Sequence, residues 1–323
     1  MDGLDTAIAA DTRRRVAAAH ARIDARELPA PSELDAIRGL TGIGAYLLRQ
    51  PYGGEELRAV LEYLVRLTTP LHHDGEVLPG WWTDSGPDGR ADTRFPGGHG
   101  NTGMAHGIAG PLALLALASL RGVVVQGQLA AIATVCSWLD SWRSSTDAGR
   151  IWPYWITRPQ LRAGRAPAPG NQRPSWCYGT AGVARAQQLA ALATGDAARR
   201  VAAEDTLTRA LTDPRQLTAT TDPSLCHGYA GLAHIAHRVA ADAVPGNAAR
   251  LDARIPHLLS LIDPAGASPR RTAAALIGDA SGLGLLDGAA GVALAALSCS
   301  PASTPNSSWD SCLLTVRPAH PLT

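Results

Sequence analysis

The sequence predicts an all-α fold in which helical hairpins form a ring. Three observations support this fold class. The apolar residues are mainly Ala, Leu, Val and Ile, with one Phe among 323 residues, and Ala and Leu favour helices. A glycine motif recurs along the chain, and an Ala/Leu-rich segment follows most copies. Between the copies lie segments with amphipathic helical spacing. We expect a single domain over residues 1–323.

The repeated motif is a four-residue unit that begins and ends with glycine. Its five copies are Gly39–Gly42 (GLTG), Gly107–Gly110 (GIAG), Gly179–Gly182 (GTAG), Gly228–Gly231 (GYAG) and Gly288–Gly291 (GAAG). The apolar stretch after each copy predicts an inner helix, buried nearly all round. Because glycine lacks Cβ, it permits close backbone approach and positive φ where each inner helix begins. These beginnings would then gather at one end of the ring.

The segments between the repeats predict outer helices. Glu55–Leu67 and Gln128–Trp142 have apolar residues at helical spacing. Their apolar faces consist of Leu57, Val60, Leu61 and Leu64 in the first segment, and of Leu129, Ile132, Val135 and Leu139 in the second. A further helix, roughly Thr6–Arg26, precedes the first repeat. The most apolar stretch, Met104–Leu120, is interpreted as a buried helix because it is short for a membrane span.

Two long connections, Thr68–Gly98 and Ser144–Ser175, are rich in Gly, Pro and Trp. Connections of this length inside a domain are commonly functional. Their aromatic residues include Trp81, Trp82, Trp152, Tyr154 and Trp155. The sequence leaves open whether these side chains form a peptide-binding rim or pack within the loops. Five histidines are interpreted as loop or helix-surface residues with no functional role, namely His72, His73, His99, His234 and His237.

Charge and cysteine usage exclude several classes of protein. The formal net charge is +1, which argues against a nucleic-acid-binding surface. Five cysteines form no disulfide framework, so we expect a reduced, cytoplasmic setting. The N-terminal residues lack the layout of a signal peptide. We therefore expect at most a peripheral association with membranes.

Reactive side chains stand directly before three of the repeat glycines. The segments are NTGMAHGIAG at Asn101–Gly110, RPSWCYGTAG at Arg173–Gly182 and LCHGYAG at Leu225–Gly231. His106, Tyr178 and His227 occupy the position before the glycine, with Cys177 and Cys226 beside the last two. If the repeats superpose, these side chains converge at one end of the ring.

Two thiolates and one imidazole are a suitable ligand set for zinc. Catalytic zinc keeps three protein ligands and one open position, whereas structural zinc usually has four protein ligands. The set Cys177, Cys226 and His227 therefore predicts a catalytic zinc ion. The alternative is that the two cysteines are small buried apolar residues and the histidine a core residue. The other cysteines, Cys136, Cys299 and Cys312, are expected to pack inertly.

These segments resemble the LanC lanthionine synthetase family. The matching motifs are D-x-x-x-G-L-x-G-I-G-x-Y-L-L at Asp35–Leu48, N-x-G-x-A-H-G at Asn101–Gly107, W-C-Y-G at Trp176–Gly179 and C-H-G at Cys226–Gly228. The resemblance implies an α/α toroid with Zn²⁺ bound by Cys177, Cys226 and His227. It also implies active-site roles for Asp35, His106, Arg173 and Tyr178. Family members usually have more helix before the first motif, so we expect the ring to be incomplete or closed differently on its N-terminal side.

The implied activity is that of a lanthipeptide cyclase. Such an enzyme adds a cysteine thiol to dehydroalanine or dehydrobutyrine, which forms a (methyl)lanthionine thioether ring. His106 would protonate Cα, Asp35 would orient His106, and Arg173 would stabilise the developing oxyanion. The expected partners are a dehydrated precursor peptide with its leader, a separate dehydratase and a transporter.

Three other functions remain open at this point. The first is addition of glutathione or another free thiol to dehydroamino acids in proteins. The second is another zinc enzyme on an α/α barrel, such as a prenyltransferase subunit, although that would require an Asp ligand and a diphosphate site. The third is a non-catalytic scaffold that holds a peptide in a biosynthetic complex.

Overall fold

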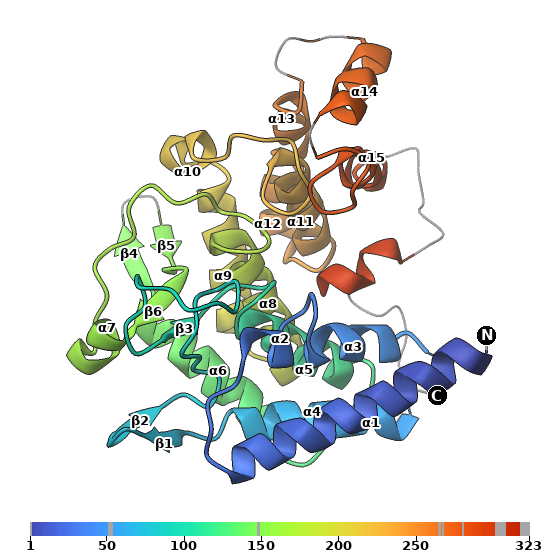
Figure 1. The fold of residues 1–323 in the computed structure, drawn as a ribbon. Coiled ribbons are helices and arrows are strands. Elements are labelled where there is room, and N and C mark those ends of the chain that lie inside the picture. The colour runs from blue at the N-terminus through green and yellow to red at the C-terminus, as the bar shows by residue number, and fades with distance from the viewer. Residues whose placement is uncertain are drawn as a thin grey trace.

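The computed structural model describes residues 2–50, 54–146, 149–263, 266, 268–279, 281–300 and 308–316. It is mostly helical, as predicted (Figure 1). The helices of the first half are α1 (Asp2–Asp24), α2 (Pro31–Leu34), α3 (Leu40–Leu47), α4 (Gly54–Leu67), α5 (Ala109–Leu120), α6 (Gln128–Trp142) and α7 (Arg158–Ala163). Those of the second half are α8 (Thr180–Thr194), α9 (Ala197–Ala210), α10 (Pro214–Thr218), α11 (Tyr229–Ala241), α12 (Pro245–Asp252), α13 (Ile255–Ser260), α14 (Pro269–Gly278), α15 (Ala289–Ser298) and the 3₁₀ helix η1 (Trp309–Leu313).

The inner helices are α3, α5, α8, α11 and α15, and each begins at or within a copy of the glycine motif. Each of them contacts the next along the chain, which gives an arc (Figure 1). The helices α4, α6, α9 and α12 follow the first four inner helices and pack against them or their neighbours. Helix α1 packs on the outside of α4 and α3. The hairpin order predicted from the repeats is therefore confirmed.

The second glycine of the motif lets the backbone fold back on itself. A Cβ atom at Gly42, Gly110, Gly182, Gly231 or Gly291 would overlap the carbonyl oxygen six residues earlier. Close backbone approach is thus the reason for glycine at this position. Positive φ is needed less often than the sequence suggested. Among the first glycines of the copies only Gly179 has it, at 114°, whereas Gly39, Gly228 and Gly288 are extended.

Backbone hydrogen bonds join the loops that precede the inner helices. The N–H groups of Ala36, Ala105, Cys177 and Cys226 each donate to the next loop around the arc. The distances are 2.9 Å for Ala36 to Ala105, 3.3 Å for Ala105 to Cys177, 3.3 Å for Cys177 to Cys226 and 2.8 Å for Cys226 to Leu286. This ladder fixes the register between repeats. It holds the residues before the glycines together at one end of the arc, as the repeat predicted.

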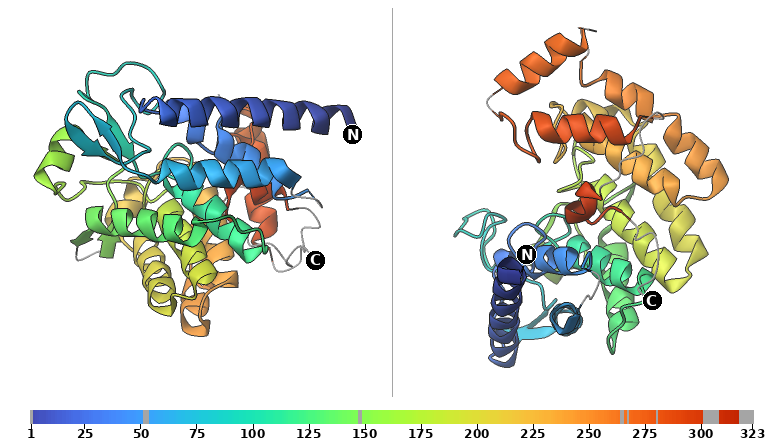
Figure 2. Two further views of the ribbon diagram at one scale, coloured as in Figure 1. Left: turned by 90° about the horizontal axis from the view of Figure 1, so that it is seen from below. Right: turned by 90° about the vertical axis from the view of Figure 1, so that its right-hand side faces the viewer.

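The C-terminal residues 308–316 lie across the arc. The Trp176 indole donates to the Leu313 carbonyl at 2.9 Å, and the buried Arg185 guanidinium donates to the Thr315 carbonyl at 2.8 Å. Helix η1 contacts α3, and Figure 2 shows it between α3 and α15. Within the described residues, this short segment bridges the last and first inner helices, because η1 contacts α3 and the Trp309 indole donates to Ser298 Oγ in α15 at 3.2 Å. The expected difference from the family on the N-terminal side of the ring stays a prediction.

The long connections contain short antiparallel strand pairs, which an all-α prediction missed. The strands are β1 (Leu71–His73), β2 (Glu76–Leu78), β3 (His99–Asn101), β4 (Ser144–Thr146), β5 (Gly149–Ile151) and β6 (Trp155–Thr157), paired as β1–β2, β3–β6 and β4–β5. The β3–β6 pair matters most, because β3 follows the first long connection directly, β6 lies in the second, and Asn101 at the end of β3 begins the Asn101–Gly107 motif. Trp81, Trp82 and Trp152 are buried, so ordinary packing is the correct interpretation for them.

Two further details differ from the prediction. Leu129 is exposed, whereas the other seven residues of the two predicted apolar faces are buried. His99 and His234 are buried rather than on the surface.

The thiols of Cys136 and Cys299 behave as expected for inert packing, since burial raises their pKa to about 11 and about 12.

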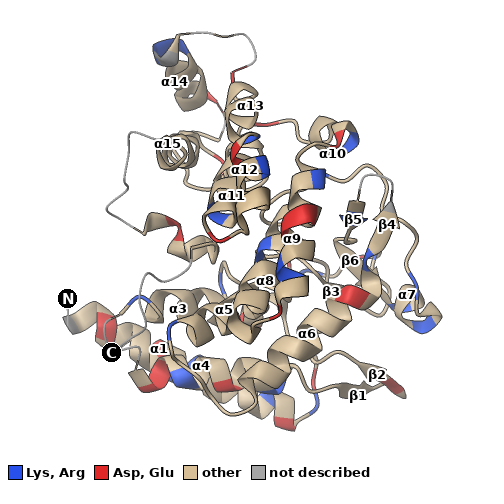
Figure 3. Ribbon diagram, turned by 180° about the vertical axis from the view of Figure 1, so that it is seen from behind, with Lys and Arg blue, Asp and Glu red and all other residues tan. Residues whose placement is uncertain are grey.

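Charged residues of both signs are interspersed over the outer helices (Figure 3), in keeping with the near-zero net charge. Among the residues that the structure describes, no helix combines the length and the apolar character needed to cross a bilayer.

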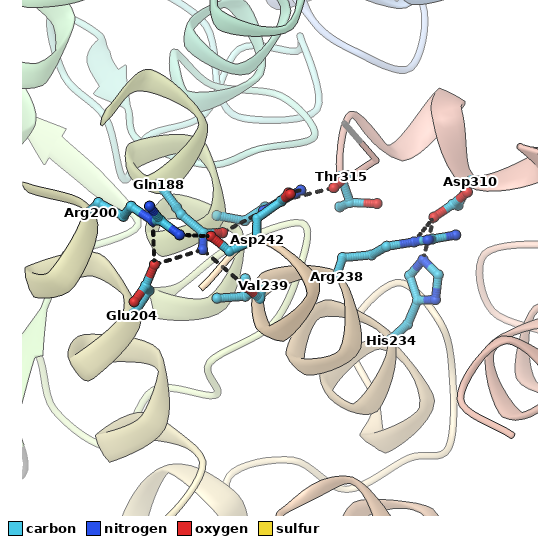
Figure 4. A network of polar contacts seen from close by, with 10 residues as sticks. Gln188, Arg200, Glu204, His234, Arg238, Val239, Asp242, Asp310 and Thr315 are labelled. Carbon is cyan, nitrogen blue, oxygen red and sulfur yellow. Dashed lines mark hydrogen bonds and ion pairs between the residues drawn. The ribbon is translucent and has the colours of Figure 1, made fainter. Parts of the chain in front are cut away.

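Asp310 holds the C-terminal segment through a buried ionic contact (Figure 4). Its Oδ2 accepts hydrogen bonds from His234 Nε2 at 2.8 Å and Arg238 Nε at 2.6 Å. Burial opposes ionisation, but these two partners lower the pKa of Asp310 to about 2. The group therefore contributes stability above pH 4 and loses it as the pH falls toward 2.

The variant Asp310→Asn is expected to lower the free energy of unfolding at pH 7 by about 2 kcal/mol, because a buried charged acceptor of one buried and one partly buried donor becomes neutral. Urea denaturation measures this difference. Asp11→Asn in α1 is a control, because Asp11 forms only surface ion pairs with Arg14 and Arg15, and it should move the midpoint far less. A midpoint for Asp310→Asn equal to that of the wild type would show that the segment is held by its apolar contacts instead.

The burial of His99 leads us to expect a second change of stability with pH. Its sign is opposite to that of a charged histidine in a salt bridge, which stabilises the fold at low pH. Burial lowers the pKa of His99 in the folded protein to about 4 from 6.5. The unfolded chain therefore takes up a proton first, so stability falls as the pH drops from 6.5 to 4. At pH 5 this group should cost about 2 kcal/mol relative to pH 7. The variant His99→Phe should flatten that part of the stability profile, whereas an unchanged slope would assign it to other histidines.

Candidate metal centre and active site

The three predicted ligands come together where α8 and α11 begin. One ligand atom each of Cys177, Cys226 and His227 lies within 4.8 Å of the other two. Two ligands of a tetrahedral zinc ion lie roughly 3.5–3.8 Å apart, so the side chains need only a small contraction to bind one. The ladder bond from Cys177 N–H to the Cys226 carbonyl sets the spacing of the two cysteines. The donor set and its geometry therefore fit a zinc ion.

One of the two thiols loses its proton readily, and the other keeps its own. A hydrogen bond from Cys226 lowers the pKa of Cys177 to about 5 against the effect of burial, and His227 helps. The hydrogen bond with Cys177, burial and the charges of Cys177 and Asp287 raise the pKa of Cys226. The hydrogen bond with Cys177 raises the pKa of His227 as well. A divalent cation in this position would replace these protons, since metal-bound thiols are deprotonated.

His106 and Asp35 form a pair on the same end of the arc. His106 Nδ1 lies 2.8 Å from Oδ2 of Asp35, which is fully buried. The other oxygen, Oδ1, accepts the backbone N–H groups of residues 37–39 at 3.1, 2.6 and 2.8 Å. The same carboxylate therefore holds the turn before α3 and orients the imidazole. With Nδ1 held, Nε2 of the quarter-exposed His106 is the nitrogen able to exchange a proton.

Tyr178 connects this pair to the sulfur cluster. Its ring lies 6.2 Å from the His106 ring, centroid to centroid, and it directly follows Cys177. Its hydroxyl accepts a hydrogen bond from Asn101 Nδ2 at 3.3 Å, and burial raises its pKa to about 12. The phenol therefore stays protonated near neutral pH, so it can donate a hydrogen bond or line the site with its ring, but it does not act as a base.

The rings of Tyr154 and Trp155 lie beside the Tyr178 ring and line the same part of the site. Both rings lie 5.6 Å from the Tyr178 ring, and both are partly exposed. The Tyr154 hydroxyl donates to the Arg173 carbonyl at 2.8 Å, so it holds the segment that leads to Cys177. Of the five aromatic residues noted in the long connections, these two are the ones that reach the site.

Arg173 lines a cleft that opens beside His227. The cleft has a volume of about 860 Å³ and is bounded by the loops before α11 and α15 and by α14. The lining also includes Asp222, Ser224 and Asp287. A volume of this size accommodates several residues of an extended peptide. Arg173 thus lies in the same cleft as His227, near enough for its charge to act on that imidazole.

Asp222 and Asp287 are site residues that the sequence-based prediction missed. Asp222 Oδ2 lies 3.5 Å from His227 Nε2, and Asp287 Oδ1 lies 3.6 Å from His227 Nδ1. The repeat did contain a signal for both. Asp222 stands six residues before its glycine, as Arg173 does, and Asp287 stands directly before its glycine, as His106 does.

A family model described as "Lanthionine synthetase C-like protein" matches residues 11–314. The chain belongs to the lanthionine synthetase C-like family. The Nisin biosynthesis protein NisC of Lactococcus lactis subsp. lactis is 24% identical over 209 residues, which are 64% of this chain and 49% of that protein. The chain described here thus spans about half the length of this curated relative.

A solved structure of nisin cyclase has the same fold. Its TM-score to this lanthionine synthetase C-like chain is 0.79 at 23% sequence identity, and the match covers 97% of this chain and 73% of that one. The predicted family and its mostly helical fold are therefore confirmed.

Proposed function

We propose that this protein is a zinc-dependent lanthipeptide cyclase, which adds cysteine thiols to dehydroalanine or dehydrobutyrine and so forms (methyl)lanthionine rings. The observation that carries the proposal is the position of the Cys₂His cluster. Its His227 lines a cleft large enough for a peptide, and the cluster lies at the same end of the arc as the His106–Asp35 pair. A prenyltransferase-like enzyme is less favoured, because the cluster contains no Asp ligand among the described residues.

Cys177, Cys226 and His227 would hold Zn²⁺ with one position left for the substrate sulfur. When bound there, the ion would lower the pKa of the substrate thiol, so that the nucleophile would be a thiolate at neutral pH. Two protein thiolates reduce the net charge of the site, which leaves that sulfur reactive.

The protein's own side chains then act on the acceptor. As the sulfur bonds to Cβ, the double-bond electrons move onto the peptide carbonyl and give an enolate. The positive charge of Arg173 stabilises the enolate oxygen. His106, with Nδ1 fixed by Asp35, delivers a proton from Nε2 to Cα. The hydroxyl of Tyr178 and its ring orient the peptide at this position. The net reaction forms one C–S bond and one C–H bond and breaks the S–H bond and the C=C π bond. The thiol proton passes to solvent, and His106 takes up a proton from solvent.

The proposed substrate is a dehydrated precursor peptide that still carries its leader. A separate dehydratase must act first, because the reaction consumes dehydroamino acids. A transporter is the partner expected to act on the product. We propose a cytoplasmic setting, in which the cluster thiols stay reduced.

Incubation of the zinc-loaded protein with a dehydrated, cysteine-containing peptide tests this function. Ring closure leaves the mass unchanged, so the readouts are loss of alkylatable thiol and resistance to fragmentation within the ring. A parallel reaction offers glutathione to a dehydrated peptide without cysteine. Thiol loss only in the first reaction supports the cyclase. A glutathione adduct in the second supports intermolecular thiol addition, and binding without either reaction supports a scaffold.

A further inference from the structure

His227 has a carboxylate at each of its two ring nitrogens, and only one nitrogen can bind a metal. Asp222 faces Nε2 at 3.5 Å and Asp287 faces Nδ1 at 3.6 Å. In metal sites a carboxylate on the second nitrogen commonly fixes the tautomer and the ring orientation. The two carboxylates therefore compete for this role, and their surroundings decide between them.

Asp222 is held rigidly by its own loop. Its Oδ1 accepts the Ser224 N–H at 2.9 Å, and its carbonyl oxygen accepts the Tyr229 N–H at 3.1 Å. The Ser224 hydroxyl accepts the His227 N–H at 3.2 Å, which links the loop to the backbone of the ligand itself. A Cβ atom at Gly228 would overlap the carbonyl oxygen and Oδ1 of Asp222, so the glycine of the C-H-G motif makes room for this aspartate.

Asp287 has no comparable support. Its side chain is 58% exposed, against 29% for Asp222. Within the described residues its carboxylate accepts no hydrogen bond from the backbone. An exposed carboxylate of this kind can move aside when a cation reaches Nδ1, whereas Asp222 cannot leave Nε2 without breaking its loop.

We infer that Asp222 is the positioning residue of the metal centre: it accepts the proton of His227 Nε2 and thereby presents Nδ1 to the ion between Cys177 and Cys226. The inference rests on the proposed zinc site, but it concerns the affinity for the ion and the state of the imidazole. It does not depend on whether the loaded protein closes thioether rings.

Zinc affinity, measured by competition with a chromophoric chelator, tests the inference in purified protein. Asp222→Asn is expected to bind zinc 10- to 100-fold more weakly, the usual effect of losing such a partner. The matched control Asp287→Asn, at a similar distance from the same ring, is expected to change the affinity by no more than about threefold, as for a single exposed charge. Equal affinity of Asp222→Asn and wild type, or a larger loss in Asp287→Asn, would overturn it.

A second measurement needs no variant. In zinc-loaded wild-type protein with ¹⁵N-labelled histidine, the proton of His227 should reside on Nε2, and Nδ1 should show the shift of a metal-bound nitrogen. A proton on Nδ1 would refute the inference even if Asp222→Asn failed to fold. Failure of the cyclase assay with both results intact would count against the proposed reaction alone.

Discussion

Cys177→Ala is expected to lose bound zinc and ring closure together. The side chain is 6% exposed and supplies one of only two sulfurs in the cluster. Two remaining ligands hold zinc weakly, so the substrate thiol would keep a pKa near 8.5 and be mostly protonated at pH 7. The rate of ring formation should fall about a thousandfold or more, because metal activation of a nucleophile contributes several kcal/mol and each 1.4 kcal/mol is about tenfold.

The control for this variant is Cys136→Ala. Cys136 is also buried, but it lies in α6 and belongs to no group of metal ligands in the described residues. It should keep one zinc per chain and near wild-type turnover. Elemental analysis and the thiol-alkylation assay are the measurements. If Cys177→Ala retained stoichiometric zinc and full activity, the zinc centre would have to be abandoned.

The repeat explains how much of this site could be predicted. Each inner helix begins with the same backbone turn, in which glycine meets a carbonyl group six residues earlier. Superposed turns bring equivalent positions together, so Cys177, Cys226 and His227 could be grouped without a structure. Asp35 was also recognised, but its second role in holding the turn became visible only from its three backbone hydrogen bonds.

The features that the sequence did not predict depend on contacts between distant residues. Strands β3 and β6 pair across the two long connections, and neither has the length or alternation that identifies a strand. The buried state of His234 follows from its contact with Asp310, 76 residues away. No local pattern encodes such contacts. Asp222 was overlooked for a different reason: its register relative to Arg173 was available, but an aspartate before proline is also an ordinary turn residue.

His106→Ala is expected to separate chemistry from metal binding. The imidazole is not a ligand, so the variant should keep one zinc per chain, yet removal of a general acid typically costs 10²- to 10⁴-fold in rate. Titration with the dehydrated peptide should show that binding persists. A variant with the wild-type rate would remove His106 from the mechanism, and one without zinc would make it part of the metal centre.

The pairing of His106 with Asp35 makes this prediction sharper. Asp35→Asn keeps the shape of the side chain and one oxygen for the turn before α3, but it weakens the 2.8 Å contact that holds Nδ1. If Asp35 acts only through His106, the double variant should be no slower than His106→Ala, because groups that work as a unit are not additive. Multiplied losses in the double variant would instead mean that Asp35 supports the turn independently. Zinc content and thermal unfolding of Asp35→Asn distinguish that structural role from an effect on proton transfer.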